Sequence, residues 1–388
     1  MNVDRQISNK TPRLAIIGAG VLGATLALEA TNAGVQVTIF ERDRAPQGAS
    51  VRNFGLLWIS GRAHGEELRL AIEARQKWEE IADIIPAIGF NPRGSLTMLT
   101  RQDELDLAIA AIATDPKNLR QLSILHRSEI LDMGLDIGYN VIGGMYCAVD
   151  SSIEPRLTVP SLLEHLCHLP NFDIQFASEV SRVNDGVVAL ATGEHYAFDA
   201  IVSTTGSNYG GFLSRLFEPK AVGLGLTRLI MTETAPITRR IGPAIADGDS
   251  MRYYPFFQFE NAPQLQPQAD KPETFGAQLL MVQRPNGAIT IGDTHEHDPN
   301  GTFEIDTSIT SYFIEKAKSI FPSLDLQLAS VWEGTYSQPL DRKRAYVAKR
   351  LQDNFLLVTG TGGRGMTLAP SIAHETFEWL TNYFARTL

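Results

Sequence analysis

The stretch Arg13-Leu-Ala-Ile-Ile17 runs directly into Gly18-Ala-Gly-Val-Leu-Gly23 near the start of the sequence. The apolar run predicts a central parallel strand that is buried on both faces. A segment rich in small residues follows, predicts a helix and ends at Gly34. A second predicted strand, Gln36–Phe40, stops in front of Glu41. This order of strand, glycine turn, helix, strand and acid predicts a dinucleotide-binding unit, with a purely structural glycine loop as the alternative.

Each glycine of the motif has a physical task. Gly18 lets the chain turn tightly off the strand, Gly20 lets the backbone approach a pyrophosphate, and Gly23 lets the helix pack closely on the strand. The helix N-terminus offers unpaired N–H groups and the positive end of its dipole to the phosphates. Glu41 lies where a carboxylate accepts hydrogen bonds from a ribose diol. The expected cofactor-binding residues of this unit are Gly18, Ala19, Gly20, Val21, Leu22, Gly23 and Glu41.

A second strand and glycine loop occupy the C-terminal part of the chain. Asn354–Val358 predicts a buried strand, and Thr359-Gly-Thr-Gly-Gly-Arg-Gly-Met-Thr367 and a helical apolar pattern follow it. A nicotinamide dehydrogenase has no standard use for this element, whereas a flavoprotein needs a cradle for its isoalloxazine ring. Between the two glycine elements, Phe198–Gly206 predicts a strand that delivers a glycine turn to the same edge, and Val180–Val183 is expected to line an adenine. The sequence therefore favours FAD over NAD.

Several motifs together carry a family resemblance. They are Gly18–Gly23, Glu41-Arg42, Gly48-Ala-Ser-Val-Arg-Asn-Phe-Gly55, Ser152-Ile-Glu-Pro-Arg156, Thr204-Thr-Gly206 and Gly360–Pro370. With them the chain resembles the D-amino-acid oxidase, glycine oxidase and sarcosine oxidase superfamily of flavoproteins. The resemblance implies an α/β (α+β) fold, in which a glutathione-reductase-type, Rossmann-like FAD domain carries an inserted mixed-sheet substrate domain. It also implies that the Gly48–Gly55 loop passes beside the flavin and that the C-terminal glycine loop holds the flavin's pyrimidine edge.

These implications extend the expected cofactor site and divide the chain. The further cofactor-binding residues are Arg42, Ala49, Ser50, Asn53, Phe54, Gly55, Val180, Thr205, Gly206, Gly363, Arg364, Gly365, Met366 and Thr367. The expected FAD-domain segments are 12–85, 150–220 and 330–388, and the expected substrate-domain segments are 86–149 and 221–329. Within the second substrate segment, Gln278–Val282 and Ala288–Ile291 flank Arg284-Pro-Asn-Gly287, a turn sequence that predicts a β-hairpin.

The substrate is expected to be a small amine or amino acid. Ala49–Gly55, Gly292-Asp-Thr-His-Glu296 and the C-terminal loop are similar to a narrower clade, whose members are proposed to oxidise aminophosphonates related to 2-aminoethylphosphonate. Glycine-oxidase-like enzymes often carry a Trp-x-Gly-x-Arg-Pro segment whose arginine binds the substrate carboxylate. Here Trp332-Glu-Gly-Thr-Tyr-Ser337 places Tyr336 at that position. Either another residue binds the anionic group of the substrate, or that acidic group differs from the carboxylate of a simple amino acid. Oxidation of glycine, sarcosine or a D-amino acid is the alternative function.

Arginines are the candidate anion anchors, because guanidinium forks suit both carboxylate and phosphonate oxygens. The candidates are Arg52, Arg62, Arg252 and Arg364, with a surface arginine or an FAD phosphate contact as the alternative for each. Tyr253, Tyr254 and Tyr336 are candidate pocket walls, with core positions as the alternative. The residues given provisional catalytic roles are Arg364, Tyr336, Arg52, Arg252 and Tyr254.

The resemblance also implies a mechanism. A neutral amine delivers hydride from its α-carbon to flavin N5, and water hydrolyses the resulting imine, so no side-chain general base is required. Arg364 and the helix N-terminus around Gly363–Thr367 are expected to stabilise charge on the reduced flavin. No cysteine or histidine stands in the first flavin loop, so FAD is expected to bind non-covalently. Oxygen or another acceptor then reoxidises the flavin.

The composition and the remaining sequence patterns argue against several other classes of protein. The 388 residues include 34 basic and 44 acidic side chains, which gives a net charge of −10 and argues against nucleic-acid binding. Met1–Thr11 carries no apolar secretory segment, and residues 14–28 are too short and glycine-rich to span a membrane. We therefore expect a cytoplasmic protein without a transmembrane segment. His295 and His297 have no third ligand in the pattern, so no metal site is expected.

Minor motifs and competing functions remain. Cys147 and Cys167 lack metal-site spacing and are expected to be buried free thiols, and Asn300-Gly-Thr302 matches a glycosylation sequon by chance. A flavin monooxygenase would be expected to show a Gly-Asp pair before its last FAD helix, where this chain has Thr359-Gly-Thr-Gly-Gly363. An NAD-dependent dehydrogenase, which the second glycine loop disfavours, and a non-catalytic flavoprotein subunit are the remaining competing functions.

Overall fold

The computed structural model describes residues 11–297 and 306–387, which divide into two compact units. The described parts of unit 1 are 11–51, 156–225 and 336–387, and those of unit 2 are 52–155, 226–297 and 306–335. The predicted sequon at Asn300 lies outside the described residues.

The first division differs from the expected one. Residues 52–85 belong to unit 2, whereas the sequence analysis groups 12–85 with the FAD segments. The physical reason is that hydrogen bonds tie this stretch to the rest of unit 2. Ser60 donates to Asp150, and Arg75 donates to the carbonyl of Val149.

Unit 1 is built on a six-stranded sheet in the order β19-β20-β12-β1-β2-β8. Its strands are β1 (Arg13–Ile17), β2 (Gln36–Phe40), β8 (Phe172–Gln175), β12 (Ala200–Ser203), β19 (Val347–Gln352) and β20 (Phe355–Thr359). All neighbouring pairs are parallel except β19 and β20. The apolar side chains of β1 are buried, as expected for a strand covered on both faces. The predicted Rossmann-like sheet is confirmed, together with the strands at both glycine loops.

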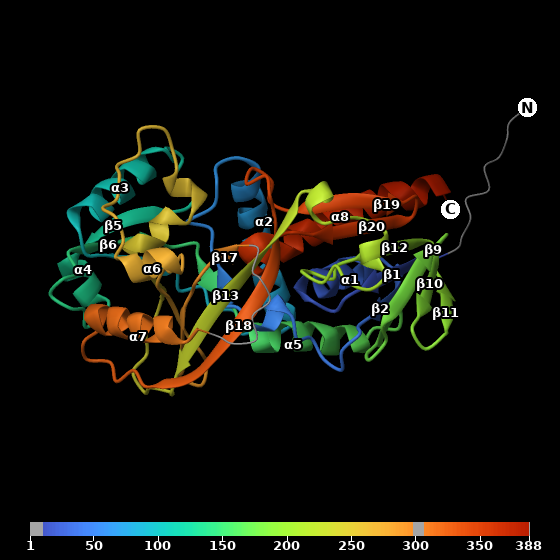
Figure 1. Cartoon of the computed structure of the whole chain (residues 1–388), viewed down its shortest axis with the longest axis horizontal. Coiled ribbons are helices and arrows are strands. Elements are labelled where there is room, and N and C mark those ends of the chain that lie inside the picture. The colour runs from blue at the N-terminus through green and yellow to red at the C-terminus, as the bar shows by residue number, and fades with distance from the viewer. Residues whose placement is uncertain (1–10, 298–305, 388) are drawn as a thin grey trace, which may run out of the picture. The chain divides into compact units, whose positions relative to one another are not determined.

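Two helices from opposite ends of the chain pack together in unit 1 (Figure 1). Helix α1 (Val21–Asn32) follows the first glycine turn, and α8 (Gly365–Thr387) follows the last one. Small residues such as Ala24 and Ala27 are wholly buried in α1, which lets it lie against both the sheet and α8. Helix α5 (Pro155–Cys167) precedes β8.

A small antiparallel sheet completes unit 1. It consists of β9 (Val180–Asn184), β10 (Val187–Leu190) and β11 (His195–Ala197). Its apolar residues Val180 and Val188 share a hydrophobic core with Ile17 and Phe40 of the parallel sheet. The segment between β8 and β12 is therefore a packed part of this unit.

Unit 2 contains most of a nine-stranded mixed sheet, and two of its strands continue into unit 1. The order is β17-β13-β16-β15-β14-β4-β6-β5, and β18 pairs with β13. The strands are β4 (Ser95–Leu99), β5 (Leu122–His126), β6 (Gly143–Cys147), β13 (Leu224–Thr234), β14 (Ala244–Asp247), β15 (Leu280–Gln283), β16 (Ile289–Gly292), β17 (Glu296–His297) and β18 (Leu328–Pro339). Strands β4 and β14 run parallel, while β4 and β6 run antiparallel, so the predicted mixed sheet is confirmed.

Helix α7 (Ser308–Ile320) covers one face of this sheet. Its residues Phe313 and Ala317 are wholly buried in a core that includes Ile245 of β14 and Ile291 of β16. Strands β15 and β16 form the hairpin that the turn sequence predicts, with Met281 opposite Ile291. The other elements of unit 2 are α2 (Glu66–Ile84), α3 (Gln102–Ala113), α4 (Arg127–Asp132), α6 (Asp270–Thr274) and the short strand pair β3 (Leu56–Leu57) and β7 (Ser151–Ser152).

Two further sequence expectations can be compared with the fold. Cys147 is a buried free thiol as expected, but Cys167 is exposed, because it lies at the C-terminal end of α5. Among the described residues, none of the helices has the length and apolar character that crossing a membrane requires.

Candidate active site

The first glycine turn is packed so closely that a side chain at Gly23 would clash with neighbouring atoms. A Cβ atom added at Gly23 would lie 2.1 Å from the carbonyl oxygen of Gly18 and 2.8 Å from Oγ1 of Thr204. Gly18 itself has a φ of +106°, in a region that favours glycine, and its N–H donates to the carbonyl of Phe40. The turn is therefore shaped for close approach of a ligand to the backbone, and it fits the pyrophosphate of a dinucleotide.

Two side chains hold this turn in place. The carboxylate of Glu41 accepts from the N–H of Ala19 at 2.8 Å and from the N–H of Asp43 at 3.0 Å. Oγ of Ser50 accepts from the N–H of Val21, the first residue of α1, at 3.0 Å. Glu41 thus lies at the glycine turn, where its oxygens can also accept from a ribose diol. Leu22 is buried beside Val21, while Arg42 is half-exposed and pairs with Asp43.

The turn after β12 meets the end of β20 within unit 1. The carbonyl of Gly206 accepts hydrogen bonds from Oγ1 of Thr359 at 2.6 Å and from Oγ of Ser337 at 3.2 Å. Ser337 also accepts from the N–H of Gly360 at 3.1 Å, and Thr205 donates to the carbonyl of Asn208. These bonds bring two predicted glycine segments to one edge of the sheet.

Sequence reasoning missed the hydroxyl groups that join these segments. Thr359 and Ser337 lie at or near the ends of their strands, and both are buried. A serine or threonine at the end of a predicted strand is the sequence signal that could have identified them. Val180, expected near an adenine, is buried in the apolar core of the unit. Tyr336 is buried at the start of the last segment of unit 1.

The C-terminal glycine loop leads into the longest helix among the described residues. A 3₁₀ turn, Gly362–Arg364, precedes Gly365, where an added Cβ would lie 2.7 Å from Oγ1 of Thr361. The Arg364 guanidinium folds back on the loop and donates to the carbonyls of Thr361 and Arg344 at 3.1 and 3.3 Å. Met366 and Thr367 are buried in the first turn of α8. The loop therefore places Gly363 and the helix N-terminus at one position, where backbone N–H groups can bind an anionic edge.

The predicted loop Gly48–Gly55 divides between the two units. Ala49 and Ser50 form a 3₁₀ turn in unit 1, while Arg52 to Gly55 belong to unit 2. Gly55 has a φ of +76°, and a Cβ there would lie 2.0 Å from the carbonyl oxygen of Ile153. Oδ1 of Asn53 accepts from the N–H of Gly55 at 2.7 Å. Phe54 is buried, whereas Arg52 is exposed.

Arg52 lies against the strand β18 within unit 2. Its Nη1 donates to the carbonyl of Glu333 at 3.2 Å, and its own carbonyl accepts from Nε1 of Trp332 at 2.9 Å. The Arg52 side chain is exposed, so its guanidinium is accessible to solvent.

Arg62 and Tyr254 are buried together in unit 2. Arg62 donates to the carbonyl of Trp58 at 2.6 Å and pairs with Glu67 at 3.2 Å, and its guanidinium lies over the Tyr254 ring at 5.6 Å. Burial raises the pKa of the Tyr254 phenol above its ordinary value, so it stays protonated at neutral pH. A Cβ on Gly61 would lie 2.5 Å from this ring. Arg62 is thus committed to an internal ion pair.

Tyr253 stacks on the ring of His295, with centroids 4.0 Å apart. Nδ1 of His295 is 3.0 Å from the carbonyl oxygen of Gly276, and Nε2 is 3.8 Å from the carboxylate of Asp293. Over the residues that the structure describes, no cluster of three or more histidine, cysteine or acidic side chains could hold a metal ion.

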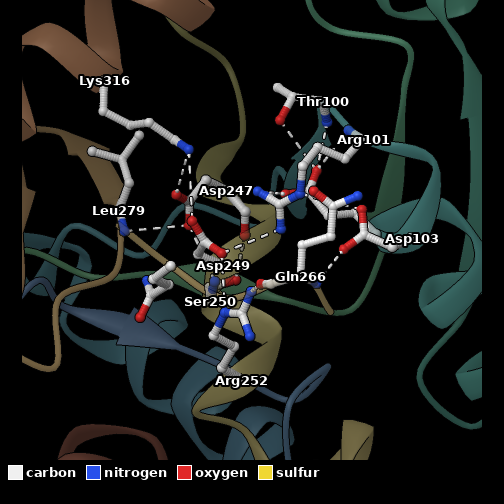
Figure 2. Close-up of polar contacts among 12 residues, drawn as sticks. Thr100, Arg101, Asp103, Asp247, Asp249, Ser250, Arg252, Gln266, Leu279 and Lys316 are labelled. Carbon is white, nitrogen blue, oxygen red and sulfur yellow. Dashed lines mark hydrogen bonds and ion pairs between the residues drawn. The ribbon is translucent and has the colours of Figure 1, made fainter. Parts of the chain in front are cut away.

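Arg252 belongs to a network of charged side chains in unit 2 (Figure 2). Its Nε binds Asp249 at 3.1 Å, and its Nη2 donates to the carbonyl of Gln266. Asp249 also pairs with Arg101 at 3.4 Å and with Lys316 at 3.7 Å. The structure therefore gives Arg252 an internal partner, as it does for Arg62.

Asp247 is the buried centre of the same network. Oδ1 accepts from the N–H groups of Ser250 and Leu279, and Lys316 lies 3.5 Å from Oδ2. Burial raises the pKa of Asp247 to about 6, although the nearby ammonium of Lys316 opposes this shift. The network holds the segment that leads into Tyr253.

Comparison with known proteins agrees with this geometry. The sequence profile described as "FAD dependent oxidoreductase" matches residues 13–379. One subunit of the opine oxidase of Agrobacterium tumefaciens (strain Ach5) is 24% identical over 376 residues, which cover 93% of this chain and 91% of that protein.

Solved structures share the fold along nearly the whole chain. Glycine oxidase from Bacillus cereus ATCC 14579 superposes with a TM-score of 0.77 at 18% identity, covering 96% of this chain and 98% of that one. Iminodiacetate oxidase from Chelativorans sp. BNC1 gives 0.73 at 17% identity, with 95% of each chain covered. Both neighbours confirm the predicted fold class. Because the family profile spans most of the sequence, the chain belongs to the FAD dependent oxidoreductase family and is an enzyme that uses FAD.

Proposed function

We propose that this enzyme oxidises the C–N bond of a small amine that carries an anionic group, with FAD bound non-covalently. The named neighbours act on glycine, iminodiacetate or opines, and this supports an amine that carries an acidic group. An aminophosphonate such as 2-aminoethylphosphonate or its N-methyl derivative is the first candidate. An amino acid such as glycine, sarcosine or a D-amino acid is the second.

The proposed cofactor site uses the residues of unit 1 described above. Glu41 would bind the ribose, the N-terminus of α1 would bind the pyrophosphate, and Gly363–Thr367 would hold the pyrimidine edge of the flavin. When bound, FAD supplies a two-electron acceptor for the hydride that leaves the substrate. Arg364 and the N-terminus of α8 would stabilise negative charge at that edge.

One observation carries the choice of substrate class. Tyr336 replaces the arginine of the glycine-oxidase-type motif, while Arg52 presents an exposed guanidinium that binds the carbonyl of Glu333. Arg62 and Arg252 bind the carboxylates of Glu67 and Asp249. Arg52 is exposed and lies in the loop that the family resemblance places beside the flavin, so we assign the anion anchor to Arg52. A guanidinium fork can hold a phosphonate through two oxygens.

The chain's own residues need not remove a proton from carbon. The substrate amine must be neutral, so that its nitrogen lone pair assists departure of the hydride, and the resulting imine reacts with water. The phenol of Tyr254 is held protonated by burial, so it is suited to donate a hydrogen bond and not to act as a base. The family's chemistry fits this arrangement, because placement of the substrate is the main requirement.

The acceptor and the cellular location are further proposals. We propose molecular oxygen or another acceptor as the oxidant of reduced FAD, and we propose a cytoplasmic location as a separate point. Steady-state oxygen consumption and cell fractionation test these two points separately.

The test is an anaerobic titration of the purified holoenzyme. Glycine, sarcosine, D-alanine, 2-aminoethylphosphonate and its N-methyl derivative are added separately, with 2-aminoethanol as the matched control that lacks an anion. Bleaching of the visible flavin absorption by a phosphonate but not by 2-aminoethanol supports the proposal. Bleaching by an amino acid alone supports the second candidate, while bleaching by 2-aminoethanol at an equal concentration contradicts the need for an anion.

A further inference from the structure

Three consecutive carbonyl groups of unit 2 are each bound by a side chain from far along the chain. Nε1 of Trp332 donates to the carbonyl of Arg52 at 2.9 Å. Arg284 binds the next two, with Nη2 donating to Asn53 and Nη1 donating to Phe54, both at 3.0 Å. A single guanidinium thus spans two peptide units of a segment that lies about 230 residues away in the sequence.

Arg284 is almost wholly buried, with only 3% of its surface exposed. Its third donor, Nε, binds Oγ1 of Thr290 at 2.8 Å. The carboxylates of Glu154 and Glu233 lie 3.7 and 3.9 Å away. A buried cation is tolerated only when charge and hydrogen-bond partners surround it, and Arg284 has both.

The backbone of Arg284 is held by hydrogen bonds within its own hairpin turn. It stands at the turn between β15 and β16, where its N–H donates to the carbonyl of Ala288 at 2.7 Å and its carbonyl accepts from Gly287. A hairpin turn needs no buried cation, since backbone groups close it. The guanidinium therefore has a task beyond closing its own turn.

The far end of the segment is fixed independently. The N–H of Ile153 donates to the carbonyl of Gly55 at 2.8 Å, and there is no room for a Cβ at Gly55. The segment Arg52–Gly55 is therefore held at both ends and along its carbonyls, so its conformation is set before any ligand binds.

We propose that Arg284 is a positioning residue that presets Arg52–Gly55 for FAD and for the substrate anion. The inference rests on the proposed function and on the expectation, from the family resemblance, that this segment contacts the cofactor. Through Arg284 the hairpin β15–β16 fixes the backbone of Asn53 and Phe54 and the point at which the Arg52 side chain begins. Arg284 itself touches neither cofactor nor substrate in this role.

Arg127 provides a matched control in the same unit. Its guanidinium also binds three backbone carbonyls, those of Gly138, Val141 and Ile137, which lie 10 to 14 residues along the chain. Removing either guanidinium frees a comparable set of carbonyls, but only Arg284 acts on the predicted flavin loop. Any loss common to both variants is therefore structural.

The experiment compares Arg284→Met, Arg284→Lys and Arg127→Met as holoenzymes and as apoproteins. The measurements are the FAD dissociation constant, the flavin midpoint potential and Tm, none of which requires turnover. For Arg284→Met we expect FAD binding about tenfold weaker or more, as loss of roughly one charge-assisted hydrogen bond would produce, together with a shifted potential. Arg284→Lys, which keeps the charge but loses the fork, should fall between wild type and Arg284→Met. Arg127→Met should lower Tm and leave both flavin quantities unchanged.

Equal losses of Tm in the two Met variants, with wild-type FAD affinity and potential in both, would overturn the proposal. If Arg284→Met does not fold, Arg284→Lys and Thr290→Val, which removes the acceptor of Nε, carry the same test. Failure of the substrate titration while Arg284 variants still alter FAD binding would refute the proposed function alone. A substrate that bleaches the flavin, with unaltered FAD binding in the Arg284 variants, would refute the positioning role alone.

Discussion

The glycine turn of unit 1 and the segment Arg52–Gly55 of unit 2 are two predicted cofactor-binding elements that are held by different means. The turn Gly18–Gly23 depends on the absence of side chains at Gly18 and Gly23, although the side chains of Glu41 and Ser50 also accept from its N–H groups. The segment Arg52–Gly55 keeps its shape because long side chains from Trp332 and Arg284 reach it. The first element is broken by adding atoms and the second by removing them.

The largest effect is expected at Gly23. Substitution by Ala would place a Cβ 2.1 Å from the carbonyl oxygen of Gly18, so the turn must open, at a cost of about 3 kcal/mol or more. We expect Gly23→Ala to be purified without FAD and with a lowered Tm. Gly210→Ala is the control, because a Cβ there meets only Oδ1 of Asn208 at 3.5 Å. If Gly23→Ala bound FAD as tightly as Gly210→Ala, the close packing of the turn would not be what shapes the site.

The next effect tests a side-chain anchor in unit 2. Asp150 is fully buried and accepts from the N–H groups of Ile59 and Ser60 and from the hydroxyls of Ser60 and Ser95. Asp150→Ala leaves these donors without their acceptor, which we expect to cost about 2–3 kcal/mol in the free energy of unfolding. Chemical denaturation of the holoenzyme measures this loss.

The control for that loss is Asp136→Ala, in which the replaced carboxylate is half-exposed and paired with Arg239. Exposed pairs contribute little, so its stability should stay within about 1 kcal/mol of wild type. Equal stabilities for the two alanine variants would mean that unit 2 does not depend on buried polar anchors.

The third prediction distinguishes Arg52 from Arg252, which are equivalent candidates for the anion anchor in the sequence. Arg52→Ala removes the proposed anion anchor, so we expect KM for the anionic amine to rise roughly 10- to 100-fold, as loss of a charge-assisted hydrogen bond would produce. Arg252→Ala removes the partner of Asp249 and should lower Tm with a smaller change in KM. A larger rise in KM for Arg252→Ala than for Arg52→Ala would reverse the assignment.

The smallest effect concerns the dependence of stability on pH. Burial raises the pKa of Asp247 to about 6 from an ordinary value of 3.8, so the folded protein holds this proton over a range where the unfolded chain has released it. Asp247 therefore makes stability fall as pH rises from about 4 to about 6, with no further change above that range. Asp247→Asn keeps an oxygen to accept from Ser250 and Leu279 but cannot titrate.

We expect the Tm of Asp247→Asn, relative to wild type, to rise between about pH 4 and pH 6 and then stay level. Asp353→Asn, whose carboxylate is fully exposed, is the control for the replacement of Asp by Asn. A flat difference for Asp247→Asn would show that the buried carboxylate titrates as it does in the unfolded chain.

The same contrast explains what the sequence could predict. The strands flanking both glycine loops, α1, α8 and the β15–β16 hairpin follow from local apolar patterns and turn residues, and the structure confirms them. Their signals lie within a few residues of each other, as local steric rules require. The expected division at residue 85 differs from the boundary of the compact units at residue 51, because that boundary depends on contacts such as the one between Ser60 and Asp150.

The polar part of the site was less predictable for the same reason. Arg62 and Arg252 are candidate anion anchors because they are arginines. In the structure they form internal ion pairs with Glu67 and Asp249. In the sequence Arg284 stands in a predicted turn, and an arginine in an otherwise apolar hairpin is a signal of a buried polar role. Which carbonyls a guanidinium reaches is decided by the tertiary fold, so residue spacing does not encode it.

The most direct test of the central claim is an anaerobic single turnover of the wild-type holoenzyme with a limiting amount of 2-aminoethylphosphonate. The account predicts that each equivalent of amine bleaches one equivalent of flavin and yields one equivalent each of aldehyde and ammonia after imine hydrolysis. If neither this amine nor any amino acid of the panel bleaches the bound flavin, then amine oxidation is not the reaction of this enzyme.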